Sequence, residues 1–299
     1  MKQKITAQKG MVIGMNKYVL QTNSLSKSFG KTEILHEIDM SIEFGDVYGL
    51  IGQNGAGKTT LLRLISGLMK PTKGTINLQT DKAFLGYMPQ SCRFDDNAKV
   101  SDIIRFFSRL RVADPQNSIL LGEKLKLDMN KKVKYLSPGQ QKKLQMIIAM
   151  TGEPDLYILD EPTAGLDPNA TFEMKSIIKD IHNKGKSIII SSHILQDMEE
   201  ICTNVAIIQN GRLIYNDEIE SCYIFRVAKV SEQVFNKLSN DFRLSVDELG
   251  TTITAKISRE QVPILISALN MNNISIFEVT VSNVKRIVQE QLHLEEVQK

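Results

Sequence analysis

The sequence has few of the features that would place it in a specialised class of protein. Its 299 residues include only three cysteines, Cys92, Cys202 and Cys222, and no C-x-x-C pair. That spacing supports neither a disulfide framework nor a zinc site, and it favours reduced thiols. No apolar run approaches the roughly 20 residues of a membrane-spanning helix, so no segment is predicted to span a bilayer. The net charge of +3 is too small to indicate nucleic-acid binding by itself.

The N-terminal residues have no acidic side chain and no long apolar segment. A secretory signal would follow its basic residues with an apolar stretch of roughly 7–15 residues. Residues 1–16 do not contain one. We therefore expect a flexible tail at 1–16, or a start of translation at Met15.

The distribution of apolar residues predicts an α/β domain. Residues 18–50 alternate as three strands would, and the third leads through a glycine-rich turn into a helix predicted over 59–68. Residues 156–160 and 187–191 are short apolar runs, which are typical of central parallel strands. Helices are predicted across about 91–150, and Asn210-Gly211 predicts a hairpin turn.

After about residue 217 the pattern changes. The order of strand-like and helix-like runs becomes β-α-β-β-α-β, with a hairpin turn near Leu249-Gly250, a second helix over about 260–269 and a last helix from Asn283. We therefore predict a domain over 17–217 with a helical subdomain at about 91–150. A small α+β domain of the split-βαβ type follows over 218–299, with a role in dimerisation or another accessory role.

Residues 52–59 read G-Q-N-G-A-G-K-T and fit the pattern G-x-x-x-x-G-K-[ST]. Glycines at these places let successive backbone N–H groups surround a phosphate, and the following helix adds its positive N-terminus. The lysine of this pattern, Lys58, reaches the β- and γ-phosphates, and the Thr59 hydroxyl can bind Mg²⁺. Because strand, loop and helix occur in the required order, we prefer phosphate binding to a structural glycine turn.

Asp160 and Glu161 follow a predicted buried strand. Open α/β sheets bind ligands at the carboxyl ends of their strands, which is where these carboxylates fall. Asp160 is predicted to hold Mg²⁺ and Glu161 to polarise the attacking water. An acidic helix cap is the alternative, and the nearby phosphate loop makes it the weaker one.

These motifs, together with others in the same order, resemble the ABC ATPase family over about residues 18–215. Residues 136–140, L-S-P-G-Q, resemble the family signature L-S-G-G-Q, and residues 164–167 resemble the loop that crosses the dimer interface. Gln90 ends a Y-M-P-Q run, His193 ends S-S-H, and Phe29 lies where the family has an aromatic residue that stacks on adenine. The resemblance implies a P-loop NTPase cassette that forms a dimer around ATP and Mg²⁺.

The resemblance also implies a role for each matched position. The expected catalytic residues are Glu161, His193 and Gln90, and the expected Mg²⁺ site is Thr59, Gln90 and Asp160. The residues expected to contact ATP, some of them from the opposite subunit, are Phe29, Gly52, Asn54, Gly55, Ala56, Gly57, Lys58, Thr59, Thr60, Ser137, Gly139, Gln140 and Asp167.

Two positions depart from the family pattern. Phe29 replaces the commoner tyrosine, which leaves the stacking face intact. Pro138 replaces a glycine of the signature and removes one backbone N–H. Donors from Ser137 and Gly139 remain, so we expect weaker or slower activity rather than none. Five lysines surround the signature, and we expect a solvated helical face there rather than a nucleic-acid site: Lys131, Lys132, Lys134, Lys142 and Lys143.

The length and insertions of the sequence favour one type of ABC protein. The chain has a single cassette, and the stretch from Gln90 to Ser137 is too short for a coiled-coil insert. We therefore expect a transporter ATPase that binds separate permease subunits on the cytoplasmic face of a membrane. It is expected to pair with a second ATPase subunit as a homodimer and to bind no nucleic acid. Export, as in bacterial drug or lantibiotic-immunity systems, is the preferred direction. An importer with a regulatory C-terminal domain and a soluble, non-transport ABC ATPase are the alternatives.

Overall fold

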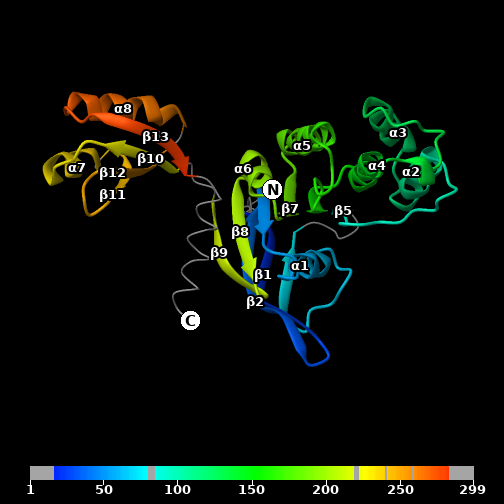
Figure 1. The fold of residues 1–299 in the computed structure, drawn as a ribbon. Helices are drawn as coiled ribbons and strands as arrows, with labels where there is room; N and C mark the ends of the chain where they lie inside the picture. The colour runs from blue at the N-terminus through cyan, green and yellow to red at the C-terminus, as the bar shows by residue number, and fades with distance from the viewer. Residues whose placement is uncertain (1–16, 80–84, 219–221, 240, 258, 283–299) are drawn as a thin grey trace, which may run out of the picture.

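The computed structural model describes residues 17–79, 85–218, 222–239, 241–257 and 259–282 (Figure 1). The predicted tail at 1–16 and the predicted helix from Asn283 lie outside these ranges. Within them, no helix is both long enough and apolar enough to cross a membrane.

A six-stranded sheet forms the centre of the larger unit. Its order is β5-β6-β7-β3-β8-β9, with parallel pairs from β5 to β8 and β9 antiparallel at the edge. Every residue of β3, β6 and β7 is buried, which explains why these strands read as continuous apolar runs. The strands are β3 (Val47–Ile51), β5 (Leu85–Met88), β6 (Leu156–Asp160), β7 (Ser187–Ser192), β8 (Asn204–Gln209) and β9 (Arg212–Glu218).

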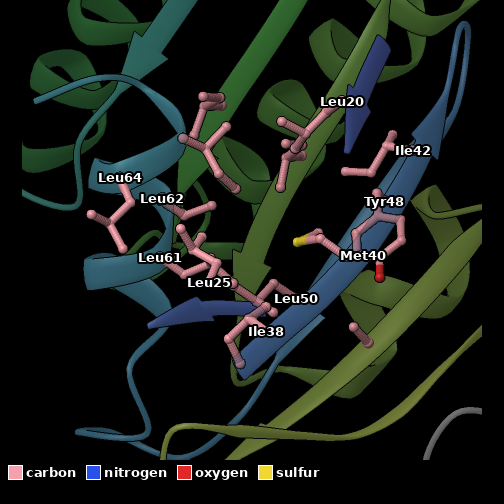
Figure 2. Close-up of a cluster of buried hydrophobic side chains, with 14 of the residues drawn as sticks. Leu20, Leu25, Ile38, Met40, Ile42, Tyr48, Leu50, Leu61, Leu62 and Leu64 are labelled. Atoms are coloured by element: carbon pink, nitrogen blue, oxygen red, sulfur yellow. The ribbon is translucent and has the colours of Figure 1, made fainter. Parts of the chain in front are cut away.

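One face of this sheet packs on an antiparallel sheet and a helix. The antiparallel sheet has the order β2-β1-β4 and consists of β1 (Tyr18–Phe29), β2 (Thr32–Glu43) and β4 (Lys73–Leu78). Helix α1 (Lys58–Ile65) buries Leu61 and Leu62 against both sheets (Figure 2). The helix ends earlier than the predicted range of 59–68, because Ser66 caps it and Gly67 turns left-handed at φ +76°.

Helices cover the other face. They are α4 (Pro138–Met150), α5 (Pro168–Asn183) and α6 (Leu195–Ile201). The predicted helical subdomain contains α2 (Val100–Leu110), α3 (Pro115–Lys124) and the 3₁₀ turn η2 (Val133–Tyr135), and it has its own apolar cluster around Ile104 and Leu144. Figure 1 shows these helices together at the β5 edge of the sheet.

A second, four-stranded sheet follows β9. Its antiparallel order is β11-β12-β10-β13, and its core around Phe225 and Leu265 is separate from the cores of the larger unit. The elements are β10 (Cys222–Val227), α7 (Glu232–Ser239), β11 (Arg243–Val246), β12 (Thr252–Lys256), η3 (Arg259–Gln261), α8 (Val262–Met271) and β13 (Ile276–Ser282). The predicted β-α-β-β-α-β order is confirmed, and so is the hairpin turn at Gly250, where φ is +74°.

Candidate functional site

The loop between β3 and α1 can be built only with glycine at two of its positions. Gly57 caps α1 at φ +111°, a left-handed backbone that side chains rarely adopt. At Gly52, a Cβ atom would lie 2.5 Å from the Ile208 carbonyl oxygen. These glycines let the loop fold tightly over the sheet, with its backbone N–H groups at the N-terminus of α1.

Lys58 begins α1 and is only 5% exposed. Its Nζ donates to the carbonyl oxygens of Gly52 and Gln53, at 2.6 and 3.2 Å. The ammonium group therefore lies under the arch of the loop. It borders a pocket of about 260 Å³, which is lined by Ile34, Gln53, Asn54, Gly55, Gly57, Lys58, Thr59, Thr60, Gln90 and Glu161.

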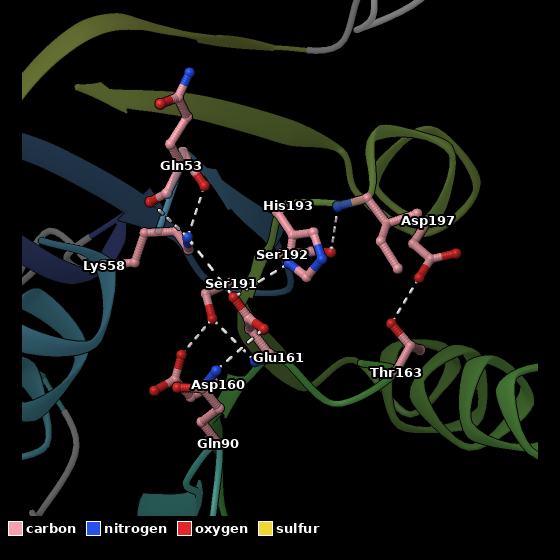
Figure 3. A network of polar contacts seen from close by, with 12 residues as sticks. Gln53, Lys58, Gln90, Asp160, Glu161, Thr163, Ser191, Ser192, His193 and Asp197 are labelled. Carbon is pink, nitrogen blue, oxygen red and sulfur yellow. Dashed lines mark hydrogen bonds and ion pairs between the residues drawn. The ribbon is translucent and has the colours of Figure 1, made fainter. Parts of the chain in front are cut away.

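Asp160 ends β6 and is completely buried. Its Oδ1 accepts a hydrogen bond of 2.5 Å from the Ser191 hydroxyl, which comes from the neighbouring strand β7 (Figure 3). Its Oδ2 is also buried and has no hydrogen-bond partner among the described residues. A buried carboxylate oxygen without a donor is costly, so this arrangement suits a bound cation.

Glu161 follows with a left-handed backbone at φ +50°, which is uncommon for a residue with a side chain. Its N–H lies close to the Ser191 carbonyl and hydroxyl oxygens, at 3.2 and 3.0 Å. Ser191 thus holds the buried Asp160 and the backbone of Glu161 together. The turn directs the Glu161 side chain into the pocket beside Lys58.

Three side chains converge on the Glu161 carboxylate (Figure 3). Gln90 Nε2 lies 3.3 Å from Oε2, while Lys58 Nζ and His193 Nδ1 lie 3.7 and 3.3 Å from Oε1. Glu161 is only 5% exposed, whereas the His193 side chain is 48% exposed. A buried carboxylate beside a cation and an amide can accept a proton from a small molecule placed between them.

His193 also borders a second pocket, of about 310 Å³, which shares Gln53, Asn54 and Gly55 of the loop with the first. That pocket is lined by Gly52, Ala56 and the turn after β8, where Asn210 has φ +47° and Gly211 has φ +74°. The predicted hairpin is therefore confirmed. The predicted phosphate-loop residues line one pocket or both, and the Glu161–His193 contact lies between them.

The expected signature residues lie elsewhere. Ser137 caps α4, and its hydroxyl accepts from Gln140 N while the Gln140 side chain accepts from Ser137 N. Pro138 occupies the first helical position, where the missing N–H has no intrahelical partner anyway. One of the two N–H donors expected to remain, that of Ser137, is therefore engaged within the capping box. None of these residues lines either pocket.

Phe29 and Asp167 also lie outside both pocket linings. Phe29 ends β1, is 49% exposed and has Lys27 Nζ 5.2 Å from its ring centre. Asp167 caps α5 through a 3.0 Å hydrogen bond from Ala170 N. An exposed ring and an exposed cap are free to contact a molecule outside this chain.

The prediction of a solvated lysine face is wrong for three of the five lysines. Lys142 Nζ donates to the carbonyl oxygens of Gln90 and Glu161, both at 3.0 Å, and burial lowers the pKa of Lys142. Lys143 pairs with Glu173 at 2.5 Å, and Lys131 donates to Gln140 at 3.2 Å. Lys132 and Lys134 are exposed, as predicted.

The sequence did not lead to a prediction for Ser191 or for the structural role of Lys142. Ser191 belongs to the same S-S-H run as His193, so its place at the carboxyl end of an apolar strand was a usable signal. Lys142 gave no signal, because its partners are backbone carbonyls far away in the sequence.

Comparison with known proteins identifies the family. The model of the family described as ABC transporter matches residues 35–164. The lantibiotic transport ATP-binding protein SrtF of Streptococcus pyogenes is 34% identical over 214 residues, which is 68% of this chain and 92% of that protein. This chain belongs to the ABC transporter family. It is an ATP-binding subunit with the α/β cassette of these ATPases, so nucleotide binding and ATPase activity follow from its family.

Two further similarities support the ABC assignment. The uncharacterized ABC transporter ATP-binding protein YhcH of Bacillus subtilis is 30% identical over 285 residues, 89% of this chain and 92% of that protein. The dimeric structure of MJ0796, a bacterial ABC transporter cassette, superposes with a TM-score of 0.61 over 67% of this chain and 98% of that one, at 18% identity. The first alignment extends into the second sheet, and the second comparison shows the cassette fold. ATP-binding subunits of this family work with transmembrane permease partners.

Proposed function

We propose that this ABC subunit hydrolyses ATP at Glu161 to energise export through a separate membrane permease. The observation that carries the proposal is the Glu161 carboxylate, which is nearly buried and contacts Lys58, Gln90 and His193 at once. Export is favoured because a similar protein of Cupriavidus metallidurans is named Nod factor export ATP-binding protein I, and the name of SrtF specifies lantibiotic transport. The exported substrate is accordingly a peptide antibiotic, a drug or a lipid-like molecule.

The charged and polar residues of the site have separate roles in this proposal. The loop N–H groups and Lys58 bind the phosphates of ATP, and Lys58 exchanges its carbonyl contacts for phosphate oxygens. Glu161 accepts the proton of the attacking water, and Gln90 and His193 orient the water and the terminal phosphate. Lys142 donates to the backbone carbonyl groups of both Gln90 and Glu161, which fixes the positions of these two residues relative to each other.

Mg²⁺ fits the donor set of this pocket. Thr59 and Gln90, which supply a hydroxyl and an amide oxygen, line the pocket. Asp160 is not part of this lining, but it directly precedes Glu161, and its buried Oδ2 has no partner among the described residues. Hard oxygen donors of this kind are those that Mg²⁺ prefers. When bound, the ion would neutralise charge on the phosphate oxygens. Ser191 would keep Asp160 oriented toward it.

The signature and Asp167 act across a dimer interface in this proposal. Ser137, Gly139 and Asp167 lie outside both pocket linings, which is consistent with their serving the site of a second subunit. We infer a homodimer in which ATP bridges the phosphate loop of one chain and the signature of the other. Phe29 would stack on adenine at the open side of the pocket.

The cassette and the second sheet have different roles. Residues 17–217 form the ATPase, and residues 218–299 support the dimer. The helical subdomain docks the permease at the cytoplasmic face of the membrane. Four apolar side chains exposed on or near α2 and α3 support this docking surface: Phe106, Leu110, Val112 and Leu120. The internally paired lysines near the signature argue against a nucleic-acid surface.

Transport in cells tests the proposal. The protein is expressed with a candidate permease in a strain sensitive to lantibiotics, beside an otherwise identical Glu161→Gln version. The proposal predicts raised resistance only with the unaltered chain, because only that chain completes ATP turnover. Equal resistance with both versions, at equal protein levels in the membrane fraction, would contradict it. Resistance with neither version would rule out lantibiotics as the exported class.

A further inference from the structure

A second polar network lies behind the Glu161–His193 contact. Thr163 is two residues after Glu161, and Asp197 is four residues after His193. The Thr163 hydroxyl donates to Asp197 Oδ2 at 2.6 Å, and each residue is only 4% exposed (Figure 3). The two chain segments that leave the site are therefore joined directly behind it.

A lysine from a third element completes the network. Lys175, on α5, places Nζ 2.6 Å from Asp197 Oδ1 and 3.1 Å from Glu200. Burial alone would lower the pKa of Lys175, but the hydrogen bonds and the negative charges of Asp197 and Glu200 together outweigh burial and raise it. Asp197 thus has a separate partner on each carboxylate oxygen, and the loop after Glu161 is tied to both α5 and α6.

The geometry of this region shows why such a tie is needed. Glu161 has a left-handed backbone, and α6 has only seven residues, with no side-chain cap at Ile194. The backbone contact between the two segments, from Glu161 N to Ser191, lies before His193 in the chain. Beyond His193, the segment after Glu161 and the segment after His193 are joined by the hydrogen bond between the Thr163 and Asp197 side chains.

A buried ion pair contributes little net stability, because desolvation offsets most of the attraction. Its contribution here is to orientation, because Thr163 and Lys175 each lie 2.6 Å from a different oxygen of Asp197. We propose that Thr163, Asp197 and Lys175 form a positioning network that sets the separation of Glu161 from His193. This inference rests on the proposed role of those two residues in ATP hydrolysis. None of the three residues lines the nucleotide pocket. They therefore act by positioning Glu161 and His193 and not by contacting the nucleotide.

The test compares two substitutions at Thr163 in the full-length protein. Thr163→Val keeps the shape of the side chain and removes the hydroxyl, whereas Thr163→Ser keeps the hydroxyl. One hydrogen bond to a charged group corresponds to roughly a tenfold effect. We expect kcat for ATP to fall about tenfold in Thr163→Val, with KM and ATP affinity changed less than about twofold. Thr163→Ser should retain at least half of the kcat.

Two controls separate positioning from general damage. Thr254→Val makes the same substitution on β12 of the second sheet and should leave kcat unchanged. Lys175→Met breaks the network from its other side, so it should lower kcat with unchanged ATP affinity. If Thr163→Val fails to fold, Lys175→Met still provides the test. Combining the two should cost less than the product of the single losses, because they break one network.

The outcomes distinguish this inference from the function on which it rests. Normal turnover in Glu161→Gln would overturn the proposed function itself. An inactive Glu161→Gln together with a fully active Thr163→Val would overturn the network alone. Parallel losses of kcat and ATP affinity in Thr163→Val, not restored by serine, would show a merely structural role and also overturn it.

Discussion

The two units of this chain bury different kinds of side chain. In the larger unit, the buried residues include Lys58, Asp160, Glu161 and Asp197, each of them charged. Among the described residues from 222 to 282, every buried side chain is apolar or aromatic, and the Arg226–Glu278 ion pair is exposed. Burying a charged side chain costs free energy, so buried charged residues concentrate at functional sites. This difference favours the cassette as the place of the chemistry, and we propose a structural role for the second sheet.

The largest effect should come from the signature, and it tests which unit holds the ATP-driven dimer together. In a symmetric dimer, Ser137→Arg would bury two guanidinium groups, one from each chain. At about 3 kcal/mol for each unpaired buried charge, the dimerisation constant should fall about 10⁴-fold. ATP binding by the single chain should remain. Light scattering with and without ATP measures this, and an undiminished ATP-dependent dimer would move the interface to the second sheet.

Glu161→Gln removes the proposed proton acceptor without changing the shape of the pocket. Hydrolysis should fall about 10²–10⁴-fold, the contribution typical of a general base. ATP affinity should be retained, and the variant should accumulate as an ATP-bound dimer. Phosphate release and equilibrium binding are measured on the same preparation. Turnover close to that of the unaltered chain would exclude Glu161 as the base.

Lys58→Ala acts on binding rather than on turnover. Losing a charged hydrogen-bond donor to the phosphates should weaken Mg-ATP affinity by about 10–100-fold. A fluorescent ATP analogue reports the affinity, and Lys132→Ala is a matched control because Lys132 is exposed. If the affinity did not change, Lys58 would not belong to the phosphate site.

Ser191→Ala tests the buried support of the two carboxylates. The hydroxyl donates to Asp160 and lies 3.0 Å from Glu161 N, so its loss should lower turnover by about tenfold. Because Asp160 would then be less well oriented, the variant should also need more Mg²⁺ for half-maximal activity. A magnesium titration at saturating ATP measures both quantities. An unchanged titration would separate Ser191 from the metal site.

The sequence predicted those parts of the site that depend on local spacing. The strand, glycine loop and helix around residues 52–59, and the acidic pair after β6, were found because neighbours in the chain remain neighbours in space. The second sheet was predicted for the same reason, since its strands alternate and its turn needs glycine.

The parts of the site that the sequence did not predict depend on contacts between segments far apart in the chain. Lys142 reaches carbonyl groups 52 and 19 residues away, and Asp197 binds a hydroxyl 34 residues away. Their residue types are common on helix surfaces, so nothing in the local pattern distinguishes them. The end of α1 was predicted three residues too late, because Leu68 continues the apolar pattern beyond the glycine that ends the helix. Such differences come from tertiary structure rather than from local preference.

The most direct test of the account is the turnover of a chain that ends at Glu218, beside the full-length protein. All the pocket residues lie before that point, and the second sheet has its own apolar core. We predict that the truncated chain binds Mg-ATP normally and keeps its kcat within about twofold, while the protein concentration at which ATP drives pairing rises. Free methionine or an exported peptide should change neither rate, as expected of a structural unit. A soluble, folded chain ending at Glu218 that cannot bind ATP would contradict the assignment of the chemistry to the cassette.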